Sequence, residues 1–302
     1  MTQAFSASPV NRANRIRGCL IGGAIGDAWG STFENRTAPP EVELPWAFTD
    51  DTQFTLATCE AILAAEAVRP DGLAQAFVRW YQARQFTGVG SSTLKALRDL
   101  EAGAHWALSG ARGERAAGNG AAIRIAPLAF LLDPNDLKER QVIRDVCRIM
   151  HHHEEAYVGA LAVIYAIQAV VTRPLGWDVL GIGEKLPDSR VRDQLRSLTT
   201  QQDMSIEQAA ERFGSSGFVG ESVPLAVFAA AQEARLGFQG VMEAIMRAGG
   251  DTDTVGSMAG QLMGAAIGSS ALPEALVSRL PHWEMLSVAD RFASWAASLS
   301  RF

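Results

Sequence analysis

Two acidic stretches, one near each end of the chain, carry the residues best suited to do chemistry. Residues 49–52 read TDDT, and residues 249–254 read GGDTDT. Aspartates at i and i+2 do not share a helix face, so they converge only where the backbone still turns, which the glycine pair permits. Their carboxylates and hydroxyls are hard oxygen donors, which favour magnesium, manganese or calcium over zinc or copper.

Each acidic stretch also has a simpler interpretation. Threonine and aspartate at a helix start are good N-caps, and negative charge is favoured there. However, each stretch holds a carboxylate beyond what a cap needs, and clustered carboxylates repel one another unless a cation binds. Two metal ions ~3.5–4 Å apart would suit four carboxylates in a hydrolytic site. We therefore predict that Asp50, Asp51, Asp251 and Asp253 meet around divalent ions.

Two further carboxylates accompany the first stretch. Glu34 follows the first helical pattern and would lie near the same centre, where it could act as an acid, a base or an activator of water. The alternative is a surface glutamate at the start of a loop. Asp27 lies inside that helical pattern, so we predict that it supports the site by hydrogen bonding rather than by binding metal.

Two other motifs give weaker indications. His151 begins a run of three histidines, but consecutive helical residues point ~100° apart, so three in a row cannot easily bind one ion. The simpler interpretation is a helix start with exposed imidazoles, although one of them could reach a ligand. Residues 86–92 (FTGVGSS) form a glycine- and hydroxyl-rich loop whose amides could hold phosphate. Many plain turns share this composition.

Two rows of glycines recur every fourth residue. One comprises Gly18, Gly22, Gly26 and Gly30, and the other comprises Gly256, Gly260, Gly264 and Gly268. A helical glycine costs about 1 kcal/mol relative to alanine, so the rows need a reason. A nucleotide-binding loop does not fit, because the spacing is not GxGxxG and no strand precedes it. We predict that the two helices cross closely and bring the acidic stretches together.

Helical periodicity extends over most of the chain, and no convincing alternating strand occurs. We predict an all-α fold, a compact orthogonal helical bundle with a central dinuclear metal site. Pro70-Asp71-Gly72 is expected to end the helix that starts at Asp50, and a helix is expected over 121–132. No linker divides the chain, so residues 1–302 are expected to form one domain, with 1–14 as a flexible tail.

Composition limits the function classes. A hydrophobic content of 48% with 20% charged residues indicates a globular core, and a net charge of −6 makes nucleic acid a poor partner. The longest apolar run, residues 156–171, falls short of the ~20 residues of a membrane span, so we expect a buried helix and no membrane. Three separated cysteines favour reduced thiols in the cytoplasm.

The motifs resemble those of the ADP-ribosylglycohydrolases, also called the dinitrogenase-reductase-activating-glycohydrolase type. The matching pieces span nearly the whole chain in the order of that family: GCLIGGAIGDAWGSTFE (18–34), FTDDTQFTLA (48–57), GNGAAIRIAPLAF (118–130), HHHEEAYVGALA (151–162), GESVPLAVF (220–228) and AGGDTDTVGSMAGQLMGAAIG (248–268). The TDDT and GGDTDT pair is the most specific part of this resemblance.

The resemblance implies two Mg²⁺ or Mn²⁺ ions and assigns roles to residues. Those matching the metal ligands of the family are Thr49, Asp50, Asp51, Asp251, Asp253 and Thr254. Glu34 matches the glutamate that assists the chemistry. Those matching the part that holds ADP-ribose are Gly88, Gly90, Ser91, Asn119 and His151.

The implied activity is hydrolysis of the glycosidic bond between ADP-ribose and a protein side chain, arginine or serine, which reverses mono-ADP-ribosylation. The ESVP piece at 221–224 is similar to the serine-hydrolysing branch. The implied partner is an ADP-ribosylated protein or conjugate, and we expect a monomer. One alternative is an immunity or regulatory protein that neutralises an ADP-ribosylating partner by contact. Another is a two-metal phosphoesterase, which fits the ligands but not the whole motif set.

Overall fold

The computed structural model describes residues 10–34, 36, 44–172, 179–201, 203–281 and 283–299. These residues are helical and contain no strand, so the predicted all-α, single-domain fold is confirmed. The α-helices are α1 (Arg12–Gly30), α2 (Asp50–Ala65), α3 (Pro70–Gln82), α4 (Ser91–Glu101), α5 (Trp106–Ser109), α6 (Leu137–Arg148), α7 (Glu154–Thr172), α8 (Val179–Glu184), α9 (Arg190–Thr199), α10 (Ile206–Phe213), α11 (Val219–Ala230), α12 (Glu233–Ala248), α13 (Thr252–Ile267), α14 (Glu274–Val277) and α15 (Trp283–Ser298). Short 3₁₀ turns are η1 (Glu114–Ala116), η2 (Asn119–Ala121), η3 (Ala126–Phe130) and η4 (Ser269–Ala271).

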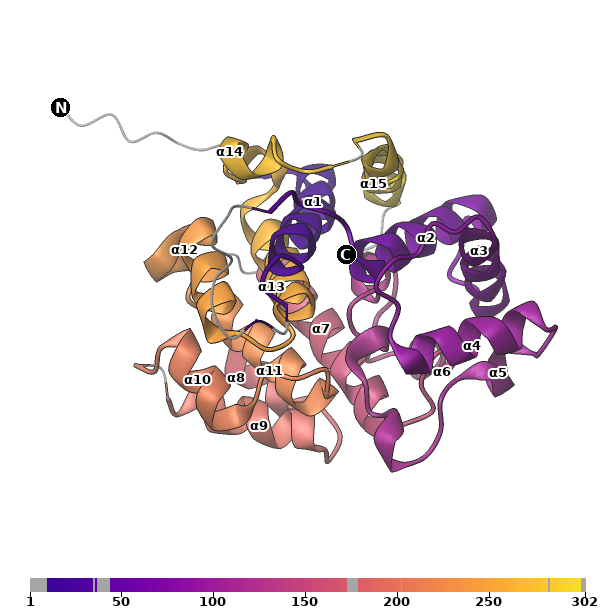
Figure 1. Cartoon of the computed structure of the whole chain (residues 1–302), viewed down its shortest axis with the longest axis horizontal. Coiled ribbons are helices and arrows are strands. Elements are labelled where there is room, and N and C mark those ends of the chain that lie inside the picture. Colours follow the sequence, from indigo (N-terminus) through magenta and orange to yellow (C-terminus); the bar gives the residue numbers. More distant parts are fainter. Residues whose placement is uncertain are drawn as a thin grey trace.

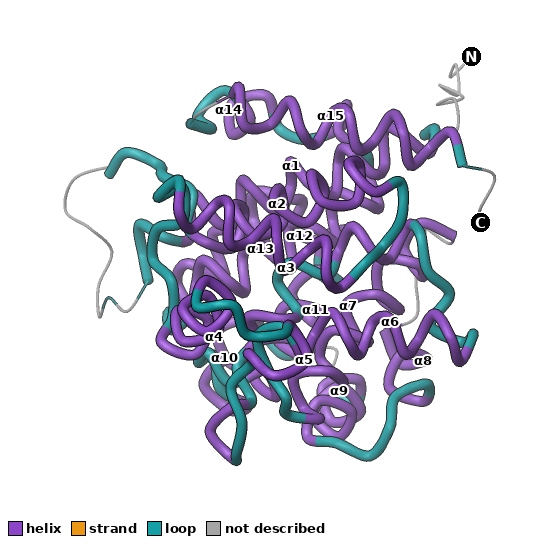
Figure 2. The backbone as a smooth tube through the Cα atoms, turned by 90° about the vertical axis from the view of Figure 1, so that its right-hand side faces the viewer, coloured by secondary structure: helices purple, strands orange, loops and turns teal. Residues whose placement is uncertain are grey.

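The helices are arranged around a central pair, α1 and α13 (Figure 1). Helices α2 to α6 lie on one side of this pair, and α8 to α12 lie on the other. Helix α15 packs across α1 and α2, and the turned view in Figure 2 shows it as an outer layer with α14. The two acidic stretches belong to the start of α2 and the start of α13, so the central pair controls the distance between them.

The two glycine rows form the contact between α1 and α13. A Cβ atom on Gly18, Gly22 or Gly26 would overlap the carbonyl oxygen of Gly264, Gly260 or Gly256, respectively. Backbone therefore touches backbone along the crossing, and any side chain there would push the helices apart. The predicted close approach is confirmed. Because α13 is almost wholly buried and α1 is buried from Gly18 to Ala28, the crossing forms the centre of the molecule.

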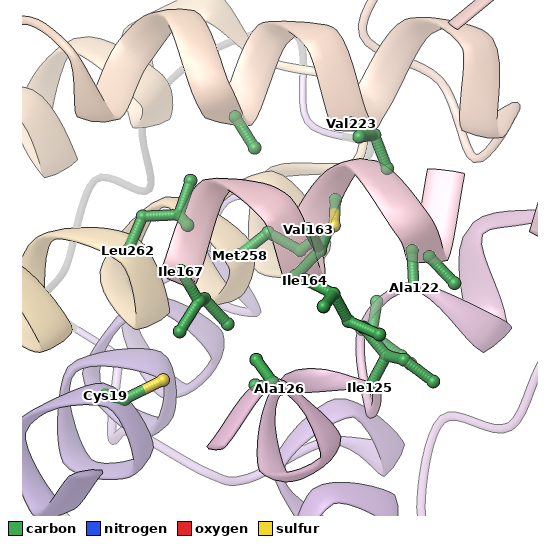
Figure 3. Close-up of a cluster of buried hydrophobic side chains, with 14 of the residues drawn as sticks. Cys19, Ala122, Ile125, Ala126, Val163, Ile164, Ile167, Val223, Met258 and Leu262 are labelled. Carbon is green, nitrogen blue, oxygen red and sulfur yellow. The ribbon is translucent and has the colours of Figure 1, made fainter. Parts of the chain in front are cut away.

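Helix α7 runs through the apolar core. Figure 3 shows its Val163, Ile164 and Ile167 among side chains from α13, α11 and the segment around η3. This helix has the length and hydropathy of a membrane span, but 72% of its apolar window is buried inside the protein. The expected buried helix at residues 156–171 is thus observed, with 19 residues in all.

Two local predictions are wrong. Pro70 does not end a helix: α2 stops at Ala65, where Glu66 adopts a left-handed conformation (φ 50°), and Pro70 starts α3 as its first residue. Proline suits that position because the first helical N–H has no intrahelical partner. Residues 121–132 do not form one α-helix, since η2 and η3 divide them and Pro127 lies in the first turn of η3.

The predicted tail, residues 1–14, lies mostly outside the described residues, although α1 already begins at Arg12. Most of the predicted proline loop, residues 35 and 37–43, also lies outside them. The domain limits 1–302 therefore stay a prediction. Among the described residues, the buried apolar side chains form one continuous cluster from α1 to α15.

Candidate metal centre

The last glycine of α1 lies against the start of α13. A Cβ on Gly30 would overlap the backbone of Thr252 and Asp253, and the Thr252 hydroxyl donates to the Gly30 carbonyl oxygen at 2.8 Å. The turn before α13 is made by Gly249 (φ 73°) and Gly250 (φ 83°), a conformation that favours glycine. The glycine pair thus directs Asp251 and Asp253 toward the end of α1, as the sequence predicts.

Asp27 joins the start of α2 to α1. Its buried carboxylate accepts hydrogen bonds from the Thr49 hydroxyl (2.6 Å), the Thr49 N–H (3.1 Å) and the Thr52 N–H (3.2 Å). The carboxylate therefore serves as an N-terminal cap supplied by another helix. This geometry gives Asp27 the hydrogen-bonding role predicted for it. The same bonds place Asp50 and Asp51 beside the end of α1.

Three carboxylates from two segments then converge. One oxygen each of Glu34, Asp251 and Asp253 lies within 4.8 Å of the others, a spacing that could hold a metal ion. Asp50 and Asp51, at the start of α2, lie near enough to this group for the charges of Asp251 and Asp253 to raise their pKa values. The residues of the two acidic stretches therefore share one centre, with exposed Glu34 at its edge.

Burial and mutual repulsion raise the pKa values of the carboxylates at the centre. Burial, followed by the charge of Asp27, raises the pKa of Asp50 to about 7. Burial and the charge of Asp251 raise the pKa of Asp253 to about 9. Burial and the charge of Asp253 raise the pKa of Asp51 well above its usual range. Buried like charges at this spacing stabilise each other's protonated forms, and a divalent cation reverses that preference.

The donor set fits such a cation. Asp51 is only 3% exposed, and its Oδ2 atom is buried without a hydrogen-bond partner. An orphaned buried carboxylate oxygen is costly unless a cation or donor pairs with it. The Thr49 hydroxyl donates to Asp27 and accepts from the Asp51 N–H, so a metal would use its remaining lone pair. Thr254 is 5% exposed in the first turn of α13.

Asn119 belongs to the acidic centre by direct contact. Its Nδ2 donates to Oδ2 of Asp251 at 2.7 Å and to the Ser222 hydroxyl at 3.2 Å. A neighbour that hydrogen-bonds a ligating carboxylate fixes the orientation of that carboxylate. The resemblance assigns Asn119 to ADP-ribose instead, and the structure leaves that role a prediction.

The segment before α11 forms a wall of the site that the sequence analysis did not select. The Asp251 N–H donates to the Ser215 carbonyl at 2.8 Å, and the Asn119 N–H donates to the Gly217 carbonyl at 3.2 Å. A Cβ on Gly217 would lie 3.5 Å from Oδ2 of Asp251. The GESVP piece pointed to this region, but only as a family motif.

The Gly88–Ser91 loop covers the start of α2. Gly88 has φ 79°, and a Cβ there would lie 3.6 Å from Oδ1 of Asp50. Gln53 holds the loop through two hydrogen bonds to Thr87, of 2.8 and 2.9 Å. By contrast, a Cβ on Gly90 would have no atom within 4 Å, and exposed Ser91 is the first residue of α4. The loop thus meets the centre at Gly88 and opens to solvent beyond it.

His151 differs from the two histidines that follow it. Its side chain is 3% exposed, and a Cβ on Gly118 or Gly120 would lie 2.9 Å from Nε2 or 3.0 Å from Cε1, respectively. His153 accepts the Glu155 N–H at 3.1 Å as part of the start of α7. The three imidazoles therefore point to different surroundings, and His151 is the one that packs against Gly118 and Gly120.

An all-helical bundle with an oxygen-rich acidic centre at a helix crossing is the class that this fold and site define. The family model for ADP-ribosylglycohydrolase matches residues 8–300. The chain belongs to the ADP-ribosylglycohydrolase family.

Individual relatives extend over similar lengths. The chain is 28% identical to an uncharacterised protein of Archaeoglobus fulgidus, with 90% of this chain and 93% of that protein covered. It is 26% identical to the mouse ADP-ribosylhydrolase ARH3, with 88% and 87% covered. A solved structure titled "ADP-ribosylglycohydrolase-related protein complex" superposes with a TM-score of 0.73 at 26% identity, covering 95% of this chain and 99% of that one.

Proposed function

We propose that the chain is a metal-dependent hydrolase that cleaves the glycosidic bond between ADP-ribose and an arginine or serine side chain, and so reverses mono-ADP-ribosylation of proteins. The observation that carries this proposal is the cluster of Glu34, Asp251 and Asp253, whose charges act on the acidic start of α2, where Oδ2 of Asp51 is buried without a partner. Membership of the family and distant similarity to proteins named ADP-ribosylhydrolase support the reaction class.

The residues that would hold two Mg²⁺ or Mn²⁺ ions are those of the two stretches: Thr49, Asp50, Asp51, Asp251, Asp253 and Thr254. When bound, such ions supply Lewis acidity at a vicinal diol. Asn119 then fixes Asp251, and Asp27 fixes Thr49, so both groups of ligands are oriented before substrate arrives. The remaining carboxylates favour the positive charge that develops at the ribose carbon in a glycosyl-transfer transition state.

Glu34 is the residue we assign to proton transfer. It is exposed, whereas Asp51 and Asp253 are buried, so its carboxylate is the member of the cluster that a bulky substrate can reach. The bond from ribose C1 to the side-chain nitrogen or oxygen breaks, and a bond from C1 to a water oxygen forms. Glu34 takes the proton of that water or gives a proton to the leaving side chain.

The substrate site would continue from the acidic centre along the Gly88–Ser91 loop and the segment with Asn119 and His151. Gly88 lies beside Asp50 at the start of α2, and His151 packs against the 118–120 turn, whose Asn119 bonds to Asp251. Amides at the start of α4 suit a pyrophosphate, because a helix N-terminus favours anions. We further propose that the protein acts as a monomer in the cytoplasm, with a serine linkage favoured by the ESVP piece.

The test is incubation with arginine-, serine- and aspartate-linked ADP-ribosylated peptides plus Mg²⁺ or Mn²⁺, read by mass spectrometry. We expect release of ADP-ribose from one of the first two, and loss of at least about 10²-fold in Glu34→Gln and Asp251→Ala. Glu101→Gln, an exposed glutamate at the end of α4, is the matched control and should retain full activity.

Unchanged biological activity in both site variants would favour a contact-based role. Phosphate release from a simple ester without ADP-ribose release would favour a phosphoesterase.

A further inference from the structure

Arg124 is a fully buried guanidinium behind the 118–120 turn. It is 0% exposed, donates from Nη2 to the Val146 carbonyl at 3.1 Å, and lies 4.9 Å from the ring centre of Phe77. Its Nε and Nη1 are buried and have no hydrogen-bond partner. A guanidinium can only donate hydrogen bonds, and leaving buried donors unsatisfied is costly. An acceptor beside Arg124 is therefore needed.

His151 offers that acceptor. Its backbone N–H donates to the Cys147 carbonyl at 3.0 Å, so His151 and Arg124 are attached to adjacent carbonyls at the end of α6. Nδ1 of His151 is buried and also has no hydrogen-bond partner. Both side chains are buried, and the positive charge of Arg124 lowers the pKa of His151. One unpartnered donor of Arg124 and this acceptor on His151 give one buried water the two polar partners that it needs.

The imidazole of His151 is neutral at neutral pH. Burial, then the positive charge of Arg124 and the charge of His153, lower the pKa of His151 to about 4. In a neutral imidazole one nitrogen accepts a hydrogen bond and the other carries the hydrogen. A donor bound to one nitrogen therefore places the hydrogen on the other. Nε2 lies against Gly118, where a Cβ would come within 2.9 Å of it, and the next residue, Asn119, bonds to Asp251 of the acidic centre.

We infer that Arg124 is a positioning residue that sets the tautomer of His151: a buried water accepts from Arg124 and donates to Nδ1, so that Nε2 carries the hydrogen and presents it between Gly118 and Gly120 to a bound ADP-ribose. The part of this inference that concerns ADP-ribose rests on the proposed function, whereas the tautomer does not. No contact of Arg124 with substrate is involved.

The first experiment measures the tautomer directly. Protein labelled with ¹⁵N-histidine, free of metal and substrate, is studied by long-range ¹H–¹⁵N NMR from pH 4 to 8. For His151 we expect the Nε2–H tautomer throughout the neutral range. In Arg124→Met, which keeps volume but removes charge and donors, the tautomer should become mixed and the pKa should rise. The control is Arg140→Met. Arg140 belongs to α6 and donates a hydrogen bond to the Tyr157 hydroxyl, and its removal should leave the tautomer and pKa of His151 unchanged.

The second experiment measures binding of ADP-ribose by calorimetry in the presence of Mn²⁺. Arg124→Met should weaken ADP-ribose binding about tenfold, as expected for one misoriented hydrogen bond, while Mn²⁺ affinity stays within about twofold. Arg124→Lys, which keeps the charge and some donors, should recover part of the loss and serves if the methionine variant does not fold. An Nδ1–H tautomer in the wild type, or unchanged His151 signals in both variants, would overturn the inference. Failure of the wild type to bind ADP-ribose would overturn the proposed function. The NMR result would still decide whether Arg124 sets the tautomer of His151.

Discussion

The acidic centre and the Gly88–Ser91 loop are neighbours, but different forces hold them. The centre is fixed by backbone contact: Gly26 and Gly30 admit no side chain, and Asp27 caps α2 with three hydrogen bonds. The loop is held through side chains, by bonds of Thr87 to Gln53 and Phe48, and opens to solvent at Gly90. The difference indicates that substitutions at the centre should cost more stability than substitutions in the loop.

The largest effect should come from breaking the helix crossing. Gly26→Ala places a Cβ on the backbone of Gly256, which cannot move aside as a side chain could. We expect a loss of about 3 kcal/mol in the free energy of unfolding, together with loss of metal binding. Gly72→Ala, at a helical glycine of α3 with only ordinary contacts, should instead stabilise the protein by up to about 1 kcal/mol. Chemical denaturation measures both, and similar values for the two variants would refute the comparison.

The second prediction concerns pH and metal. Because the folded-state pKa values of Asp50 and Asp253 are raised to about 7 and 9, the folded state without metal holds extra protons. Their contribution to stability is present below the ordinary carboxyl pKa of about 4 and is lost as the pH rises through 7 and 9. Melting temperatures in EDTA should fall over this range, and Asp253→Asn should flatten the fall.

Added Mn²⁺ should reverse that trend, since it binds the deprotonated carboxylates. At 100 times its dissociation constant the ion stabilises the folded state by about 2.7 kcal/mol. The gain should grow from pH 5 to pH 8. A stabilisation independent of pH, or equal in Asp253→Asn, would count against a metal at these carboxylates.

A smaller effect, on metal affinity alone, is expected at Asn119, which holds Asp251 in place. Asn119→Ala removes the 2.7 Å hydrogen bond to Asp251 and should weaken Mn²⁺ binding about tenfold without loss of fold. Asn135→Ala, which removes the hydrogen bond from the Tyr165 hydroxyl instead, is the matched control. Calorimetric titration with Mn²⁺ distinguishes them, and equal affinities would remove Asn119 from the centre.

The smallest effect should separate the loop from the centre. Gly88→Ala and Gly113→Ala both force alanine into a positive φ, 79° and 89°, at a cost of about 1–3 kcal/mol each. Only the first adds a Cβ beside Asp50, so only Gly88→Ala should raise the KM for an ADP-ribosylated peptide. Steady-state kinetics and thermal unfolding on the same samples test this, and a matching rise in KM for Gly113→Ala would show that strain alone is responsible.

The sequence predicts the parts of this structure that depend on local residue type. Glycines every fourth residue predict a close helix crossing, and carboxylates beside a glycine pair predict a shared acidic centre. Both features can be predicted because only a few residue types permit a close helix crossing or a tight acidic turn. The close crossing is observed, and Asp251 and Asp253 of the second stretch meet Glu34, with their charges acting on Asp50 and Asp51 of the first.

The parts that could not be predicted depend on partners far along the chain. Asn119 reaches Asp251 because the turn at Gly118 pairs with Phe218, a contact with no local sequence pattern. Residues 121–132 have helical periodicity, but tertiary packing and Pro127 divide them into short turns. The unpartnered atoms of Arg124 and His151 likewise become visible only once burial is known.

The bond between the Thr252 hydroxyl and the Gly30 carbonyl joins residues 222 positions apart. During synthesis the first half of the acidic centre emerges long before the second, so the nascent chain has no complete set of ligands until α13 leaves the ribosome. Closing so long a loop also carries an entropic cost. Acquisition of the ion would therefore mark the completion of folding, and a truncated or misfolded chain would not bind it.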